Sequence, residues 1–530
     1  MKWNFGDLFD GCGEVLAADT PALIHGEKTV AWGELTARSN NLARALLEQG
    51  AVTGDKVAIY MRNCPEYMET LVACFKARLV PVNVNYRYRD DELYYIFDNS
   101  DAVAVVHGAE FSDHVAALES RLPVVRWIET GEQYEQLVTN GTGTALDIER
   151  SADDMLFIYT GGTTGMPKAV MWRLEDVWHA LGSGAAAPCN QGVAPETPEQ
   201  HLQNLKNSGE LLKQLVSCPL MHGTGMLTSI SALAGGSALV TLTRPGLDVE
   251  ELWDTVQNRQ VNGLVIVGDA FAKPMLKALE DNPGRWDISS LQLMVSSGVM
   301  WSPAVKDGLL SHNNTMLLLD AFGSSEALGF GSSISGAGET SGSARFTIGP
   351  DCKVFDENRE EVAPGSGVRG FIARPGPIPM GYYKDEKKTA ETFPTIDGIR
   401  YSIPGDWCTV DADGSLNLLG RGSACINSAG EKIYPEEVEE ALKTHAAVDD
   451  ALVFGVDDEK WGQAVTAVVS LMAGQELASG ELREHVRNLL ADYKSPKTIL
   501  PVESMFRAPN GKADYKAAKA YFENNVVNSD

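Results

Sequence analysis

A loop rich in glycine and threonine, residues 159–168 with the sequence YTGGTTGMPK, stands between two apolar runs of strand length. Its glycines let the backbone come close to a ligand, its hydroxyl groups donate hydrogen bonds, and Lys168 supplies a positive charge. This inventory suits the phosphates of a nucleotide, and the candidate ligands are Thr160, Gly161, Gly162, Thr163, Thr164 and Lys168. The loop is not a Walker A sequence, because Pro167 precedes the lysine and Ala169 follows it. Taken alone, it is as compatible with an ordinary surface loop as with a site.

Further short stretches carry other residues that could do chemistry. They contain, in chain order, His222, Glu326, Asp406, Arg421 and Lys512. Each of these residues alone favours a plain interpretation, since a lone histidine is usually a core residue and a lone glutamate or lysine is usually a solvated one. Only their order along the chain can decide between the two interpretations.

Composition excludes several classes of function. The chain has 530 residues, too many for one core, so two or three domains are expected. Its formal net charge of −28, without a basic run, argues against nucleic acid and anionic membrane surfaces as partners. No run approaches the ~20 apolar residues of a membrane span, and no signal core opens the chain. The eight cysteines and nine histidines lack metal-ligand spacing. A cytoplasmic protein with reduced thiols is expected.

The elements that must position these residues alternate between strand and helix. Strand patterns at 56–60, 80–84 and 102–106 are separated by helix patterns at 65–77 and 90–97, and the alternation resumes between residues 239 and 319. Such alternation predicts parallel sheets with crossover helices. A polar segment, residues 185–213, interrupts it and is interpreted as a partly helical insertion that caps a site or an interface.

From about residue 351 the pattern becomes β-rich, with Gly and Pro between short strands, which predicts a small distorted β-barrel. A small α+β segment follows. The predicted fold class is therefore α/β: a large N-terminal domain of parallel-rich sheets plus the small barrel (residues 1–421), and a small mobile α+β C-terminal domain (residues 422–530).

In this order the stretches resemble the ANL superfamily of adenylate-forming enzymes, which includes acyl-CoA synthetases, peptide-synthetase adenylation domains and luciferases. The resemblance covers nearly the whole chain. It implies that the loop at 159–168 binds phosphates, although Gly161 replaces the usual serine. It implies that His222, in PLMHG (219–223), lines the acyl pocket and orients the carboxylate. The adenine pocket is implied at Ser297, Gly298 and Val299.

The resemblance assigns most of the remaining residues to the nucleotide. In AFGSSE (321–326), Phe322 replaces the usual tyrosine that stacks on adenine, and Ser325 replaces the threonine that meets the α-phosphate. Glu326 holds Mg²⁺, for which a hard carboxylate oxygen is suitable. The other residues implied at the nucleotide are Ala321 and Gly323, with Asp406 and Arg421 on the ribose.

The last stretches are implied to move and to bind coenzyme A. Ser423 stands at the hinge, where the family commonly has Asp or Lys, and Asn427 stands where many members have Lys. The residues implied on the CoA side are Gly430, Trp461 and Gly462. Lys512, in PNGK (509–512), bridges the carboxylate and phosphate oxygens during adenylation, as a flexible cation facing developing negative charge can.

The implied function is an AMP-forming, ATP-dependent acyl-CoA ligase that uses ATP, Mg²⁺ and CoA. The stretches 83–88, 381–393 and 420–423 resemble bacterial ligases of long-chain or sterol side-chain acids, so fatty acid metabolism or steroid degradation is expected. Small residues at 223, 225 and 323 are expected to leave volume for a wide acyl group. Alternatives are an enzyme that loads a carrier protein, an aryl or short-chain acid ligase, and a non-catalytic binding protein. A homodimer is one option for the assembly.

Overall fold

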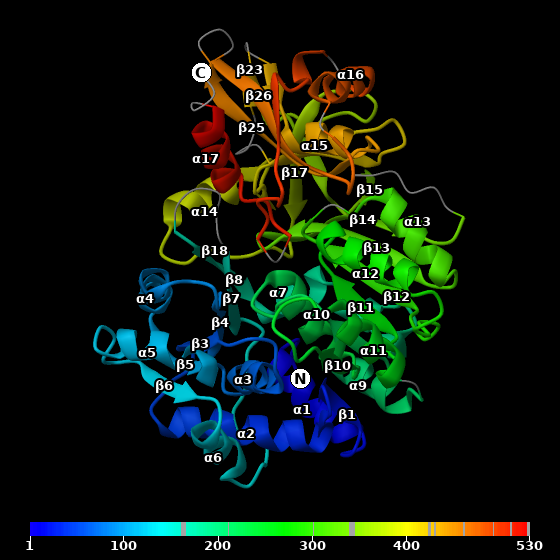
Figure 1. The fold of residues 1–530 in the computed structure, drawn as a ribbon. Helices are drawn as coiled ribbons and strands as arrows, with labels where there is room; N and C mark the ends of the chain where they lie inside the picture. The colour runs from blue at the N-terminus through cyan, green and yellow to red at the C-terminus, as the bar shows by residue number, and fades with distance from the viewer. Residues whose placement is uncertain are drawn as a thin grey trace. The chain divides into compact units, whose positions relative to one another are not determined.

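The computed structural model describes residues 1–160, 166–209, 211–299, 301–338, 345–421, 426–428, 431–458, 462–476, 478–490, 492–508 and 511–526 (Figure 1). The chain forms two compact units. The N-terminal unit contains Met1–Ser343 and Arg374–Pro404, and the C-terminal unit contains Ala344–Ala373 and Gly405–Asp530. In this division residues 344–373 and 405–421 group with the C-terminal segment. The functional boundary at residue 421 stays a prediction.

Two sheets of mostly parallel strands organise the N-terminal unit. In spatial order the first contains β14 (Ala327–Ser335), β13 (Leu317–Ser324), β12 (Leu293–Ser297), β11 (Gly263–Ile266), β9 (Lys213–Val216), β10 (Ala238–Thr241), β1 (Pro21–His25) and β2 (Lys28–Ala31). The second contains β18 (Gly381–Tyr382), β8 (Lys168–Arg173), β7 (Met155–Thr160), β4 (Val80–Asn83), β3 (Lys56–Tyr60), β5 (Ala102–His107) and β6 (Arg126–Glu129). Antiparallel pairs occur at β13–β14, β1–β2, β7–β8 and β8–β18. The parallel-rich α/β prediction is confirmed.

Crossover helices cover both faces of the second sheet, as alternation along β3 shows. Val57 and Ile59 belong to the cluster that includes residues of α2 and α3, whereas Ala58 and Tyr60 belong to the cluster that includes residues of α4 and α5. Strands buried on both faces read as continuous apolar runs, which is how these strands appear in the sequence. The helices of the unit are α1 (Phe5–Val15), α2 (Trp32–Glu48), α3 (Pro65–Lys76), α4 (Asp90–Asn99), α5 (Ser112–Glu119), α6 (Glu132–Thr139), α7 (Leu174–Ala180), α8 (Ser183–Ala186), α9 (Pro198–Asn207), α10 (Gly223–Ala234), α11 (Val249–Arg259), α12 (Asp269–Asp281), α13 (Pro303–His312) and α14 (Glu386–Thr392).

The polar segment 185–213 packs at the end of α10 that lies away from His222. His201 of α9 is fully buried, and one of its ring nitrogens lies 2.9 Å from the carbonyl oxygen of Ala234, the last residue of α10. Leu202 packs against Gly11 of α1. Because α10 has 12 residues and is therefore about 18 Å long, these contacts lie far from the helix start that follows His222. The described contacts tie the segment to the core.

The C-terminal unit combines two antiparallel groups of strands. The first pairs β16 (Lys353–Phe355) with β17 (Arg369–Pro375), β17 with β21 (Asp406–Val410), β21 with β22 (Leu416–Arg421), and β22 with β15 (Arg345–Ile348). The second has the order β24 (Glu431–Ile433), β23 (Ile426–Ser428), β26 (Gly462–Leu471) and β25 (Val448–Asp458), with β27 (Thr498–Pro501) parallel to β26. The predicted β-rich segment and the α+β segment are thus both present.

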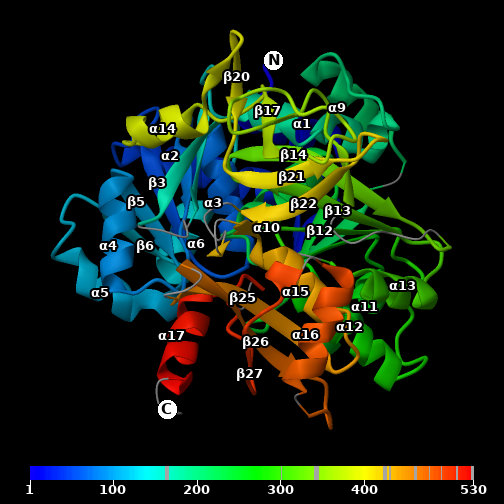
Figure 2. The same ribbon diagram turned by 90° about the horizontal axis from the view of Figure 1, so that it is seen from above.

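Helices cover both faces of the sheet around β25 (Figure 2). Ala451 and Val453 of β25 pack in the cluster that contains residues of α15 (Pro435–Lys443) and α16 (Ser479–Leu489). Leu452 and Phe454 face the other way, against Phe522 of α17 (Tyr515–Val526). Within the described parts of the chain, we find no helix that combines the length and apolar character needed to cross a bilayer.

Candidate functional site

The predicted nucleotide residues of the N-terminal unit lie at the ends of its strands. Thr160 is the last residue of β7, Lys168 is the first residue of β8, and the two are paired across the ladder. Ser297 ends β12, and Glu326 lies in the turn between β13 and β14. The candidate ligands Gly161, Gly162, Thr163 and Thr164 lie outside the described residues. A ligand at such strand ends is the usual arrangement in α/β sheets.

Asn83, a residue that sequence reasoning missed, connects the loop at 159–168 to the histidine motif. Its amide nitrogen donates to the carbonyl oxygens of Tyr159 at 3.2 Å and Met221 at 2.6 Å, and its amide oxygen accepts from the backbone nitrogen of Tyr159 at 2.7 Å. Asn83 is 5% exposed. The residues before Thr160 and before His222 are therefore fixed to one buried side chain.

The first turn of α10 lies close to Ser325, between β13 and β14, and to Gly298, after β12. A Cβ atom on Gly223 would lie 3.7 Å from the hydroxyl oxygen of Ser325. A Cβ atom on Gly298, whose φ is +93°, would lie 3.9 Å from the hydroxyl oxygen of Thr224. His222 is the N-cap residue of α10 and is half-buried. The structure thus brings the histidine motif, Gly298 and Ser325 together.

Of the three small residues expected to leave acyl volume, only Gly223 has room for a Cβ atom without a close contact. A Cβ atom on Gly223 would meet ordinary contacts. On Gly225 it would lie 2.4 Å from the carbonyl oxygen of Pro219, and on Gly323 it would lie 3.0 Å from that of Ala327. The expectation is wrong for Gly225 and Gly323, because close backbone approach requires glycine there.

Glu326 is held on its side chain and on its backbone. Its carboxylate Oε1 accepts a hydrogen bond of 2.9 Å from the hydroxyl group of Tyr382, and its carbonyl oxygen accepts one of 2.7 Å from Ser402. The carbonyl oxygen of Ser325 accepts from the indole nitrogen of Trp172 at 2.8 Å. Glu326 is only 9% exposed. These bonds fix the direction of a nearly buried carboxylate.

Phe322 and Val299 occupy different environments. Phe322 is buried, and its ring centroid lies 5.3 Å from that of Phe330. Val299 is half-buried and follows Gly298 after β12. Ala321, in β13, pairs with Ser297. The adenine contacts of these residues remain predictions.

Lys168 forms an ion pair with Asp385, the N-cap residue of α14. The hydrogen bond from Lys168 holds the pKa of Asp385 below its usual range. Asp385 also accepts a hydrogen bond of 2.9 Å from the backbone nitrogen of Lys388. A carboxylate therefore lies beside the predicted phosphate lysine, and sequence reasoning did not find it.

Residues 381–393, which we call the strap, connect several parts of the site. Gly381 and Tyr382 pair with β8, and the backbone nitrogen of Tyr383 donates to the carbonyl oxygen of Ala169 at 2.9 Å. Asp101 accepts hydrogen bonds from Tyr383 at 2.6 Å and Lys384 at 2.7 Å. The strap thus carries Tyr382 to Glu326 and Asp385 to Lys168. A strand of two residues gives no periodicity that would have predicted this pairing.

In the C-terminal unit, the two predicted ribose residues lie opposite each other. Asp406 begins β21, Arg421 ends β22, and the two are paired across the ladder. Asp406 is 6% exposed. The predicted CoA-side Gly462 begins β26 and pairs with Ser428. Gly430, Trp461 and the hinge residue Ser423 lie outside the described residues.

Lys512 is exposed and lies in a short hairpin. The backbone nitrogen of Ala508 donates to the carbonyl oxygen of Lys512 at 2.8 Å, and that of Asp514 donates to Phe506 at 2.8 Å. Gly511 has a φ of +76°, which favours glycine, and its backbone nitrogen donates to the carbonyl oxygen of Ala508 at 2.7 Å. The backbone next to Lys512 is therefore held by hydrogen bonds.

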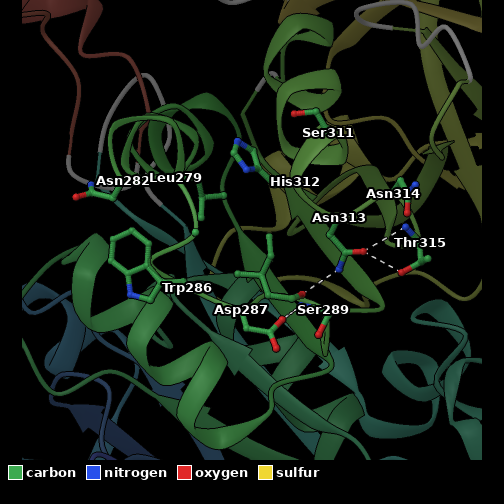
Figure 3. A pocket seen from close by; sticks show the side chains of 12 residues that line it. Leu279, Asn282, Trp286, Asp287, Ser289, Ser311, His312, Asn313, Asn314 and Thr315 are labelled. Carbon is green, nitrogen blue, oxygen red and sulfur yellow. Dashed lines mark hydrogen bonds between the residues drawn. The ribbon is translucent and has the colours of Figure 1, made fainter.

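A pocket of about 460 Å³ lies elsewhere in the N-terminal unit, near the ends of α12 and α13 (Figure 3). Asn313 donates to the carbonyl oxygens of Ile288 and Leu291, both at 2.9 Å, and accepts from the hydroxyl group of Thr315 at 2.8 Å. None of the described residues that line it belongs to the predicted site. The hydrogen bonds of buried Asn313 therefore hold the backbone at Ile288 and Leu291 against the segment that follows α13.

Comparisons with known proteins cover almost the whole chain. The model of the AMP-binding enzyme family matches residues 15–383, and that of the AMP-binding enzyme C-terminal domain matches residues 437–512. A medium/long-chain-fatty-acid–CoA/3-oxocholest-4-en-26-oate–CoA ligase of Mycobacterium marinum is 42% identical, over 98% of this chain and 96% of that protein. A 3-oxocholest-4-en-26-oate–CoA ligase of Rhodococcus rhodochrous is also 42% identical, over the same shares.

A solved structure shares the fold. The crystal structure of ATP-bound MatB from Rhodopseudomonas palustris has a TM-score of 0.81 and 21% identity, and the match covers 98% of this chain and 99% of that one. The resemblance to acyl-CoA synthetases of the adenylate-forming superfamily is confirmed by the family models and by the CoA ligases among the relatives. The chain belongs to the AMP-binding enzyme family.

Proposed function

We propose that this protein is an ATP-dependent acyl-CoA ligase that activates medium-chain, long-chain or sterol side-chain carboxylic acids. The acid's carboxylate attacks the α-phosphorus of ATP and pyrophosphate leaves. The CoA thiol then attacks the carbonyl carbon of the acyl-adenylate, AMP leaves, and acyl-CoA forms. A cytoplasmic location and a homodimer are parts of the same proposal.

The observation that carries the proposal is the convergence of separate motifs in the N-terminal unit. Asn83 fixes the residues before Thr160 and His222, Trp172 fixes Ser325, and the strap brings partners to Lys168 and Glu326. Adenylation joins two anions, so it needs charge neutralisation and alignment more than a protein nucleophile. These residues supply a cation, hydroxyl donors and a carboxylate around one loop.

Each residue has a proposed role. His222 and Gly223 receive the acid, and Thr160 and Lys168, with the loop they flank, receive the phosphates. Gly298 and Phe322 face the base, and Asp406 and Arg421 hold the ribose. Residues 422–530 move as a lid about Ser423, so that Lys512 serves adenylation and Gly430, Trp461 and Gly462 serve the CoA step.

Glu326 fits a role in holding Mg²⁺. Among the residues that the structure describes, no three or more His, Cys, Asp or Glu side chains form a metal site by themselves. One carboxylate plus substrate phosphates is the usual arrangement for this ion. The bond from Tyr382 uses only part of the acceptor capacity of Glu326, since an ionised carboxylate has about four lone-pair sites. When bound, Mg²⁺ neutralises phosphate charge.

The substrate class rests on the two bacterial relatives, and Gly223 is a position beside Ser325 where a side chain would fit without a clash. Burial of apolar surface contributes about 25 cal/mol per Å², so a long or ring-bearing acid should bind far better than acetate. The test is pyrophosphate release, with and without CoA, across acetate, hexanoate, decanoate, palmitate, an aryl-propionate and a sterol side-chain acid. We expect kcat/KM to rise steeply with acyl size. A preference for acetate would overturn the substrate class, and adenylate formation without CoA transfer would favour the loading of a carrier protein.

A further inference from the structure

The hairpin that carries Lys512 is anchored by an arginine. Arg507 stands just before the hairpin turn and forms an isolated bridge with Ala513, which directly follows Lys512. Its guanidinium Nη1 donates to the carbonyl oxygen of Gly511 at 3.1 Å. Arg507 therefore contacts the peptide group that joins Gly511 to Lys512.

The other side of the same guanidinium group is fixed to the sheet. Nε and Nη2 donate to the two carboxylate oxygens of Asp450 at 2.5 and 2.8 Å. Asp450 belongs to β25, and its Oδ1 also accepts from the backbone nitrogen of Ala451 at 2.8 Å. A fork of this kind fixes orientation as well as distance.

Both side chains of this ion pair are largely buried, unlike those of a surface ion pair. The side chains of Arg507 and Asp450 are 22% and 18% exposed. Burial alone would raise the pKa of Asp450, but the hydrogen bonds and the charge of Arg507 outweigh it and hold that pKa below its usual value. The pair therefore stays charged at neutral pH.

We propose that Arg507 and Asp450 are positioning residues that aim Lys512 during adenylation. This inference rests on the proposed function. A lysine has a long, flexible side chain, so its reach depends on the backbone below it. Without the guanidinium group, the Gly511–Lys512 peptide loses its link to β25, while the fold of the sheet is maintained by its two apolar clusters.

The test separates the two half-reactions. In Arg507→Met we expect the rate of adenylation to fall about 10- to 100-fold, because misplacement of a catalytic group lowers the rate by a factor of this size. Thioester formation from pre-made acyl-adenylate should hold at the parent rate. Arg507→Lys should recover only part of adenylation, because an ammonium group cannot fork between Asp450 and Gly511. Asp450→Asn should reduce adenylation less than Arg507→Met.

A double-mutant cycle shows whether Arg507 acts through Lys512. Lys512→Ala combined with Arg507→Met should be no slower in adenylation than Lys512→Ala alone. The matched control is Lys494→Met, which breaks the Lys494–Glu437 pair of similar exposure in the same unit. This control should lower the melting temperature comparably and keep adenylation.

Each contrary result has a distinct meaning. Full adenylation in Arg507→Met, or an additive loss in the double variant, overturns the positioning role and leaves the ligase assignment standing. Full activity of Lys512→Ala removes the role of that lysine and the inference with it. A parent protein that forms no adenylate from any acid of the panel overturns the proposed function itself.

Discussion

The carboxylate of Asp385 pairs with the ammonium group of Lys168, and the two residues lie 217 positions apart in the chain. The pair places a negative charge beside the lysine predicted to bind phosphates. We expect Asp385 to orient Lys168 and also to compete with the predicted phosphate for it. These two effects act on different kinetic parameters.

For Asp385→Asn we expect a lower KM for ATP, because the competing charge is gone, together with a lower kcat, because Lys168 loses its orientation. Steady-state kinetics with varied ATP measures both. Asp101→Asn is the matched control, since it loosens the strap at Tyr383 and Lys384 without changing the charge beside Lys168. A higher KM with unchanged kcat would contradict the competition.

Tyr382→Phe removes one hydrogen bond from the carboxylate of Glu326. A hydrogen bond to a charged group contributes about 1.5–3 kcal/mol, so we expect adenylation to fall roughly tenfold or more and to require more Mg²⁺. Glu326→Gln should have a larger effect in the same direction. Titration of Mg²⁺ in a pyrophosphate assay measures this. Unchanged Mg²⁺ dependence in both variants would remove Glu326 from the metal site.

Asn83→Ala leaves the carbonyl oxygens of Tyr159 and Met221 without their buried donor. Such a loss costs about 1–3 kcal/mol, so the melting temperature should fall and adenylation should fall with it. Asn85→Ala is the control, because the described bonds of the Asn85 side chain are local, to the backbone nitrogen of Arg87 at 3.0 Å and to the side chain of Tyr88. Equal effects of the two substitutions would show that the hydrogen bonds of Asn83 to Tyr159 and Met221 are not needed for stability or adenylation.

Gly223 and Gly225 should respond differently to a side chain. Gly223→Leu places bulk near Ser325, so kcat/KM should drop more for sterol side-chain acids and palmitate than for hexanoate. Gly225→Ala puts a methyl group against the backbone of Pro219, so it should reduce the folded yield without changing the order of preference. Acid-panel kinetics together with thermal melting separates the two results.

We expect Glu439 to make the stability of the C-terminal unit depend on pH. Burial and the charge of Glu436 raise its pKa above the ordinary 4.5, against the opposing effect of Lys443 and Arg507. The folded protein then holds a proton that the unfolded chain has released, so stability falls as the pH rises above 4.5 toward the raised pKa.

Glu439→Gln removes this titration while keeping an acceptor for Tyr515 and for the backbone nitrogen of Val453. Calorimetry between about pH 5 and about pH 8 should show the parent losing melting temperature relative to the variant as the pH rises. Glu484→Gln, at an exposed position, should show a constant difference. If the parent instead gains stability relative to Glu439→Gln as the pH rises, the pKa of Glu439 is not raised in the folded protein.

Local patterns predicted the elements well where local physics decides them. Within the alternation predicted between residues 239 and 319, α11 begins at Val249, because Asp248 caps it by accepting from the backbone nitrogen of Glu251 at 2.9 Å. The predicted alternation ends at residue 319, whereas β13 continues to Ser324, because pairing with β14 extends it through residues that are not continuously apolar.

The site was predictable where motif order identifies residues, and not where distant segments meet. Thr160, His222 and Glu326 were predicted as members of motifs in a recognised order, and their roles stay predictions. Asn83 and Asp385 lie in the stretches 83–88 and 381–393, which the sequence singled out only for their resemblance to bacterial ligases. Their roles come from register across the sheet and from a strap that follows Lys168 by more than 200 residues, contacts that no sequence period encodes.

The packing of α17 on β25 has a consequence for how the protein is made. Ala518 and Phe522, which cover Leu452 and Phe454, are translated after Lys512. The hairpin that holds this lysine therefore acquires its final support only when that helix has left the ribosome. Nascent chains that stall before residue 515 would carry the complete N-terminal unit but would lack the helix that packs against Leu452 and Phe454.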